Sequence, residues 1–260
     1  TMLKDTEYEV FSMDDKTKYG DTFSTLTFGR AIKDGIISDY KIILSVISED
    51  EIPNLLAKNY FVSPDGEAKI TIQELLKQII LAKSMNEFAI HKVVSYHQSV
   101  DSAKQFVYGG RYQLEYQRVL ENIMNTDPYR LSFSHVNGTM NSSVRSRIFD
   151  EFTYADLGLM TNAKCLTEGV DLPIIDAVMF SDPKKSIIDI IQAIGRALRT
   201  SKLKINKWSY IILPIVIPSM VHDFASIPNE SFDTLHNVLQ ALRDQDERIA
   251  DEIDKLNLSI

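Results

Sequence analysis

The stretch IIDIIQAIGRALR at residues 187–199 places a glutamine and two arginines among isoleucines. At the roughly 100° per residue of a helix, its apolar residues form one stripe, which comprises Ile187, Ile191, Ile194 and Leu198. Gln192, Arg196 and Arg199 fall together on the opposite side. The spacing therefore predicts a short amphipathic helix that directs one amide and two fixed cations at a single target. The alternative on pattern alone is a solvated basic face.

The start of this helix and one position inside it also carry a signal. Ser186 precedes the run and Asp189 follows three residues later, which is typical of a capping box at a helix start. Gly195 stands in the middle of the helix, where glycine costs about 1 kcal/mol relative to alanine. We interpret this glycine as a position of close approach to something on that side.

Strand-like and helix-like runs alternate on both sides of this stretch. The strand-like runs fall at residues 39–47, 91–97, 129–136, 154–161, 175–182 and 207–217. The helix-like runs fall at residues 70–90, 102–124 with an interruption at Gly109 and Gly110, 142–152 and 187–199. Alternation of this kind indicates βαβ units. The predicted fold class is α/β, with a mostly parallel sheet covered by helices on both faces.

Composition and charge limit the classes of protein that fit. A chain of 260 residues with 44% hydrophobic content can bury a sizeable core. A single cysteine, Cys165, excludes an internal disulfide and argues against a cysteine-based zinc site, and we predict no metal site formed by this chain alone. We find no secretory signal and no apolar run long enough to cross a bilayer, so we expect a reduced, cytoplasmic setting without membrane contact.

The net charge of −8 argues against indiscriminate coating of nucleic acid, but the charge is unevenly distributed. Residues 181–210 contain seven Lys and Arg against two Asp, whereas residues 221–260 contain nine Asp and Glu against three Lys and Arg. This segregation permits a local anion-binding surface on an acidic protein.

The two ends of the chain differ from the alternating region. Residues 1–38 contain no clear strand, and residues 229–256 are predicted to form one long charged helix, whose apolar positions are Leu235, Val238, Leu239, Leu242, Ile249 and Ile253. We therefore divide the chain into a connecting segment (1–38), an α/β domain (39–218) and a C-terminal helical extension (219–260).

Three loops that follow predicted strands are candidates for ligand binding, because ligands of parallel sheets bind beyond the carboxyl ends of the strands. The loop SHVNGTMN supplies Asn137, Gly138 and Thr139, the loop TNAKCLTEGVDLP supplies Thr161, Asn162, Gly169 and Asp171, and the loop SYHQS supplies Ser95, Tyr96 and His97. A glycine and hydroxyls before a helix suit a phosphate. The alternatives are an ordinary capped turn, a surface connection and a packing histidine.

Two of these stretches together resemble the fifth and sixth conserved motifs of superfamily 2 helicases and translocases. The Gln-x-x-Gly-Arg-x-x-Arg motif is matched at Gln192, Gly195, Arg196 and Arg199, and the Glu-Gly-Val-Asp core is matched at residues 168–171. HVNGTMN resembles a segment that contacts the nucleic-acid backbone. Residues 27–42 and 232–253 are similar to the segments that flank the second motor domain in the helicases of restriction–modification systems, of the type I, III and ISP-like group.

The resemblance implies a RecA-like domain that shares one ATP, with Mg²⁺, with a first motor domain preceding residues 1–38. Arg196 and Arg199 match the arginines that stabilise charge on the γ-phosphate, and Gln192 would hold the nucleotide or a water. Asp171, next to Gly169, would meet the ribose or orient an arginine. The implied partners are DNA, the first motor domain, and nuclease or methyltransferase domains or subunits. The residues implied at the nucleic acid are Ser95, Tyr96, His97, Asn137, Gly138, Thr139, Thr161 and Asn162.

Features that the sequence lacks limit the activity expected of this chain. It contains no Gly-x-x-x-x-Gly-Lys-Ser/Thr loop, and DEID at 251–254 lies in an acidic helical region rather than after an apolar strand. The chain alone is therefore predicted to be inactive toward ATP. Two alternatives stay open: a non-motor nucleic-acid-binding or protein-interaction module, and half of an RNA helicase. Glu168 stands where the RNA group has arginine, which favours DNA.

Overall fold

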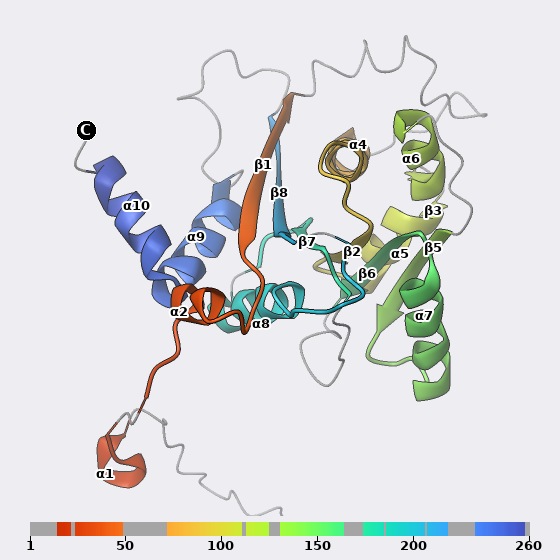
Figure 1. The fold of residues 1–260 in the computed structure, drawn as a ribbon. Helices are drawn as coiled ribbons and strands as arrows, with labels where there is room; N and C mark the ends of the chain where they lie inside the picture. The colour runs from red at the N-terminus through yellow and green to blue at the C-terminus, as the bar shows by residue number, and fades with distance from the viewer. Residues whose placement is uncertain are drawn as a thin grey trace, which may run out of the picture.

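Six strands form a single sheet in which every neighbouring pair is parallel (Figure 1). The computed structural model describes residues 15–21, 24–48, 72–110, 113–124, 131–163, 174–184, 186–205, 207–217 and 232–257. The strand order is β1-β8-β7-β2-β6-β5. The strands are β1 (Tyr40–Ser48), β2 (Lys92–Tyr96), β5 (Leu131–Asn137), β6 (Leu157–Ala163), β7 (Ala177–Phe180) and β8 (Ser209–Ile217). The predicted α/β fold with a parallel sheet is confirmed.

Helices cover both faces of the sheet and enclose two apolar cores (Figure 1). One face carries α4 (Ile72–Glu87), α5 (Val100–Tyr108) and α6 (Tyr116–Met124), and the other carries α7 (Ser142–Tyr154), α8 (Ile187–Ala197) and α9 (Asp233–Gln245). Successive strand residues point to opposite faces, so Val93 belongs to the first core and Val94 to the second. Burial of both faces explains why the strands read as continuous apolar runs.

The region predicted as broadly helical at 102–124 contains a turn of a different kind. The helix α5 ends at Gly109, whose φ of 71° favours glycine, and a two-stranded ribbon of β3 (Gly109–Gly110) and β4 (Gln113–Glu115) follows before α6 begins. The glycines therefore mark a real interruption, and the segment comprises two helices rather than one.

The buried stripe of α8 differs from the predicted one. The helix begins at its N-cap Ser186, whose hydroxyl accepts a hydrogen bond from Asp189 N at 3.2 Å, as the sequence predicted. Its buried residues are Ile190, Ala193, Ile194 and Ala197, with Leu198 directly after it. Ile187 is 36% exposed, so placing it in the core stripe was wrong. Ile191 is partly buried and packs against the core, as the stripe predicted. The small Ala193 and Ala197 let α8 lie close to the sheet.

The single C-terminal helix predicted at 229–256 is wrong, because the chain forms two helices, α9 and α10 (Glu247–Asn257). Asp246 separates them with φ −132° and ψ 107°, which are extended values. Its buried carboxylate accepts a hydrogen bond from the Tyr40 hydroxyl at 2.8 Å and from Arg248 Nη2 at 2.8 Å. Asp246 also caps α10, because Arg248 N donates to Oδ1 at 3.1 Å.

The connecting segment contains two short helices, α1 (Lys16–Tyr19) and α2 (Phe28–Lys33). Phe28 and Ile32 of α2 pack against the core that contains α8 and α9. The helix α1 has no buried residue and lies apart from the sheet (Figure 1). The division of the chain at residues 38 and 218 stays a prediction. Among the helices that the structure describes, none combines the length and the apolar character needed to cross a bilayer.

Candidate functional site

The polar face of α8 is open in this structure. Gln192 and Arg199 are exposed, and Arg196 is half-buried on the same helix. A Cβ atom added at Gly195 would meet no atom within 4 Å among the residues that the structure describes. The glycine therefore makes no close contact with this part of the chain, and the close approach that the sequence suggested needs a group from outside it.

The carboxyl end of α8 is fixed by contacts from distant segments. Lys204 Nζ and Ser209 Oγ both donate to Ala197 O, the latter at 2.6 Å. Ser38 N and its hydroxyl donate to Leu198 O at 2.7 and 2.9 Å, and Ile37 pairs with Arg199 in an antiparallel bridge. Because the backbone at Arg199 and at the two residues before it is held by these contacts, the position from which the Arg199 side chain extends is fixed.

Most of the predicted nucleic-acid residues are buried at the carboxyl ends of β2, β5 and β6. The side chains of this group are at most 6% exposed and comprise Ser95, Tyr96, His97, Asn137, Thr161 and Asn162. By contrast, Gly138 and Thr139 are exposed in the loop after β5, as are Gln98 and Ser99 in the loop after β2. The buried side chains therefore organise this edge, and the exposed loop residues and backbone groups offer its contacts. The predicted binding roles stay predictions.

A hydrogen-bonded chain of side chains connects β5 and β6 at this edge. Thr161 Oγ1 donates to Ala103 O at 2.7 Å and lies 3.4 Å from His135 Nδ1, while His135 Nε2 lies 3.2 Å from Asn137 Nδ2. Asn137 Oδ1 accepts hydrogen bonds from Thr139 N at 3.1 Å and from its hydroxyl at 2.8 Å. Burial lowers the pKa of His135 to about 4, so its ring is neutral near pH 7. This chain fixes the exposed Thr139.

A second polar cluster joins α4, the end of β2 and the loop after β7. Lys77 Nζ binds Glu74 Oε1 at 2.8 Å and Asp182 Oδ1 at 3.1 Å. His97 Nδ1 lies 3.9 Å from Asp182 Oδ2, and His97 Nε2 lies 3.0 Å from Ser95 Oγ. Burial lowers the pKa of His97 to about 4 despite the nearby carboxylate, so this ring is also neutral near pH 7.

Sequence reasoning missed Asp182, Lys77 and His135 as members of this edge. Asp182 ends the strand-like run at 175–182, and the rule that directs attention to strand ends applied to it as well. His135 is part of the quoted loop SHVNGTMN but precedes the residues selected from it. Lys77 lies within a helix and has no such signal, because its partner Asp182 is 105 residues away along the chain.

Tyr96 connects this edge to α8. Its ring stacks on Phe180 with centroids 5.6 Å apart, and Lys184 Nζ lies 4.9 Å from the ring centroid. Burial raises the pKa of Tyr96, and the charge of Arg196 acts on it in the opposite direction. The arginine of α8 is therefore close enough to the end of β2 for the two to interact. The predicted Gly169 and Asp171 lie outside the described residues.

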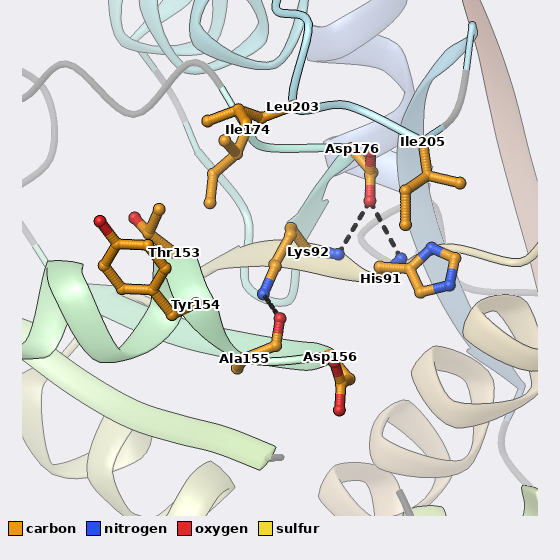
Figure 2. Close-up of a pocket in the computed structure, with 10 residues that line it drawn as sticks. All are labelled: His91, Lys92, Thr153, Tyr154, Ala155, Asp156, Ile174, Asp176, Leu203 and Ile205. Carbon is orange, nitrogen blue, oxygen red and sulfur yellow. Dashed lines mark hydrogen bonds between the residues drawn. The ribbon is translucent and has the colours of Figure 1, made fainter. Parts of the chain in front are cut away.

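A cavity of about 320 Å³ lies at the other edge of the sheet, where β2 and β7 begin (Figure 2). There Lys92 Nζ donates to the carbonyl oxygens of Phe152, at 2.6 Å, and of Ala155 at the end of α7. Asp176 Oδ2 accepts hydrogen bonds from His91 N and Lys92 N, each at 3.0 Å. Of the predicted site residues that the structure describes, none lines this cavity. Its described polar groups serve to fix the ends of strands and of α7.

Comparison with known proteins identifies relatives of this chain. Residues 72–201 match the family described as the helicase conserved C-terminal domain. The solved structure titled "ATP-dependent Type ISP restriction-modification enzyme LlaBIII bound to DNA" is 30% identical with a TM-score of 0.78, covering 95% of this chain and 16% of that one.

Two sequence relatives extend this comparison. A probable helicase of African swine fever virus is 23% identical over 81% of this chain and 22% of its own length. An ATP-dependent rRNA helicase of Candida albicans is 26% identical over 56% of this chain and 24% of its own length. The chain thus spans a quarter or less of each of these relatives.

Proposed function

Because this chain belongs to the helicase conserved C-terminal domain family of the superfamily 2 helicases, we propose that it is the second RecA-like motor domain of an ATP-dependent DNA helicase or translocase. In this proposal a first RecA-like domain supplies the phosphate-binding loop and the acids that hold Mg²⁺, neither of which the sequence contains. The two domains close on one ATP, whose hydrolysis by water to ADP and phosphate supplies the free energy for movement on DNA.

The observation that carries this proposal is the open polar face of α8. Arg199 and Gln192 are exposed there, and the space beside Gly195 can admit a phosphate chain or a neighbouring domain. Guanidinium groups are planar, permanently charged donors that suit phosphate oxygens. We assign to Arg199 and Arg196 the stabilisation of negative charge that develops on the γ-phosphate, and to Gln192 the positioning of the nucleotide or of a water.

The nucleic-acid track of this domain is proposed at the carboxyl ends of β2, β5 and β6. Thr139 and the backbone around Gly138 are exposed there, next to the start of α7. The Asn141 side chain already accepts a hydrogen bond from Ser143 N at 3.4 Å. Neutral hydroxyls and backbone N–H groups can bind phosphates without reading base sequence. In this proposal the Thr139 hydroxyl turns from Asn137 Oδ1, to which it donates in the structure, toward a phosphate oxygen.

DNA is favoured over RNA by the resemblance to a DNA-bound enzyme. The enzyme titled as bound to DNA is 30% identical over 95% of this chain with a TM-score of 0.78. From the same enzyme we propose that the longer polypeptide that contains this chain belongs to a restriction–modification system. An accompanying nuclease or methyltransferase activity is part of this proposal, since that enzyme is titled as one of both restriction and modification.

The test is hydrolysis of ATP by the longer polypeptide that the proposal requires. Arg199→Ala should slow single-turnover hydrolysis at saturating DNA by about 10³-fold or more, because arginine fingers supply about 10³–10⁵ in related phosphoryl-transfer systems. Arg196→Ala should slow it as well. Arg199→Lys should restore little, because lysine keeps the charge but loses the two-pronged geometry.

The matched control is Lys202→Ala, which removes an exposed cation just beyond the helix. It should hydrolyse ATP like the wild type, and a thermal melt should show that Arg199→Ala stays folded. Wild-type rates of ATP hydrolysis in both arginine variants would mean that the polar side of α8 is only a solvated basic face. Early melting of both would mean that the arginines stabilise the fold.

A further inference from the structure

One carboxylate, that of Asp182, joins three segments of the chain. It lies in the loop that leads from β7 to the N-cap of α8 at Ser186. Its Oδ2 accepts a hydrogen bond from Gln98 N at 2.9 Å and lies 3.5 Å from the Ser102 hydroxyl, and its Oδ1 accepts from Lys77 Nζ at 3.1 Å. Asp182 therefore fixes the loop between β2 and α5 to the segment that starts α8.

The charges around Asp182 make this link strong. Its side chain is 15% exposed, as is that of Lys77, so water screens the pair only in part. Although burial alone would raise the pKa of Asp182, the Lys77 charge and the Gln98 hydrogen bond hold it below its ordinary value. The His97 ring at 3.9 Å is neutral near pH 7, so the charged partner of the Asp182 carboxylate in this cluster is Lys77.

Further contacts run parallel to the Asp182 link. Ser181 N donates to Tyr96 O at 3.1 Å, and Lys184 packs over the Tyr96 ring while lying 3.9 Å from Asp189 in the first turn of α8. Asn237 of α9 donates to Lys184 O at 2.9 Å. The segment 181–184 is thus held on one side by the end of β2 and on the other by α8 and α9.

We propose that Asp182 is a positioning residue that couples the loop after β2 to the placement of α8. A nucleic-acid phosphate that engages the exposed Gln98–Ser99 turn would move the Gln98 amide, and the Asp182 carboxylate would pass this displacement to the segment that begins the arginine-bearing helix. This inference rests on the function proposed above. In this inference the dependence of ATP hydrolysis on DNA passes through Asp182, which lies outside both the proposed ATP site and the proposed nucleic-acid track.

The experiment measures ATP hydrolysis by the longer polypeptide with and without a saturating linear DNA duplex. Asp182→Ala should lower the ratio of stimulated to basal rate by about tenfold or more, within the range of coupling between sites. Asp182→Asn should lower the ratio less, because its amide oxygen can still accept the Gln98 N–H. A variant that merely loses stability loses both rates together and keeps the ratio.

Glu74→Gln is the matched control, because Glu74 binds the same Lys77 but makes no described contact with the loop after β2. It should keep the wild-type ratio. A wild-type ratio in both Asp182 variants, or an equal fall in Glu74→Gln, would overturn the coupling role and leave the proposed function standing. A wild-type polypeptide whose hydrolysis DNA does not stimulate would instead overturn the proposed function, and the coupling role with it.

Discussion

Gly195 shows at the scale of one residue how stability and function can oppose each other. Among the described residues nothing lies within 4 Å of a Cβ atom added there, and its φ is not in the left-handed region, so alanine fits this part of the chain without strain. Gly195→Ala should raise the free energy of unfolding of the chain by up to about 1 kcal/mol, since alanine is the better helix former. The same change should slow ATP hydrolysis in the longer polypeptide, where the proposed nucleotide or first domain approaches this face.

Gly158 is the contrasting glycine for this measurement. A Cβ atom there would lie 2.8 Å from Phe152 Cδ2 inside the sheet–helix interface. Gly158→Ala should lower the free energy of unfolding by about 1–3 kcal/mol through overpacking. Denaturant titration of both variants tests the pair, and a loss of stability in Gly195→Ala would show that its open face is occupied within this chain.

The two buried histidines should make stability depend on pH. The pKa of His97 and of His135 is about 4 in the folded chain, against 6.5 for the ordinary group. Between these values the unfolded chain binds more protons, so the free energy of unfolding falls as pH drops from about 6.5 toward 4. Each histidine contributes up to about 1.4 kcal/mol per pH unit.

The measurement is urea unfolding across this pH window for wild type, His97→Gln and His135→Gln. Each variant should show a shallower loss of stability, and His236→Gln, at an exposed position on α9, should follow the wild type. Burial raises the pKa of Asp176, which acts in the opposite direction, but comparison with wild type removes its contribution. Parallel curves of unfolding free energy against pH for all four proteins would contradict the burial of the two histidine rings in their uncharged form.

At the scale of elements, the joint between α9 and α10 depends on Asp246. Asp246→Ala would leave the buried Tyr40 hydroxyl without its acceptor and remove the cap of α10. The free energy of unfolding should fall by about 2–4 kcal/mol, the sum expected for an unsatisfied buried group and a lost cap. Thermal and denaturant melts measure this change.

Asp244→Ala is the control, since Asp244 is exposed only two residues earlier on α9. It should change stability by less than about 0.5 kcal/mol. If Asp246→Ala is equally mild, the break between the helices does not depend on the buried carboxylate, and the two helices could rearrange into the single helix that the sequence suggested.

The same joint shows how far elements could be predicted from sequence. Runs such as 39–47 and 207–217 are apolar and β-branched, so the strands β1 and β8 were predictable from local pattern. Asp246 looks like one more charge on a solvated helix. Its partner Tyr40 lies 206 residues away, and only the folded chain brings the two together.

The residues of the candidate site also comprise some whose placement local sequence predicts and others whose placement it does not. The polar face of α8 follows from local periodicity, so Gln192 and Arg199 were correctly expected on an exposed side. The polar residues that end β2 and β6 looked like contact residues, yet Ser95 and Thr161 are fully buried. Burial at a strand end depends on which helix covers it, and no local pattern contains that information.

At the scale of the whole molecule, the isolated chain should not turn over ATP. It lacks the phosphate-binding loop, and the proposed site needs a second domain. The measurement is phosphate release by the purified chain with and without DNA. Hydrolysis that DNA stimulates and that Arg199→Ala abolishes would contradict the assignment of this chain as half of a motor.

Binding of the isolated chain to DNA should be weak and sensitive to salt. The net charge of −8 opposes association, and the proposed track of this domain is only half of the one that two motor domains would offer. Affinity for a duplex should still fall as salt rises, because exposed cations of the basic segment, such as Lys202 and Lys207, displace counterions bound to the phosphates. Tight binding to one sequence at high salt would favour the interaction-module alternative.

The pairing of β1 with β8 has a mechanical consequence. The two strands are parallel and in register over nine residues, from Tyr40 opposite Ser209 to Ser48 opposite Ile217. Once the contacts of α2 and of residues 37–38 with the core and with the end of α8 have yielded, a force that enters through residues before Tyr40 pulls β1 along its own length. The ladder is then loaded in shear, and its hydrogen bonds must yield together rather than one at a time. An edge strand attached this way can transmit tension from a preceding segment into the sheet without peeling away.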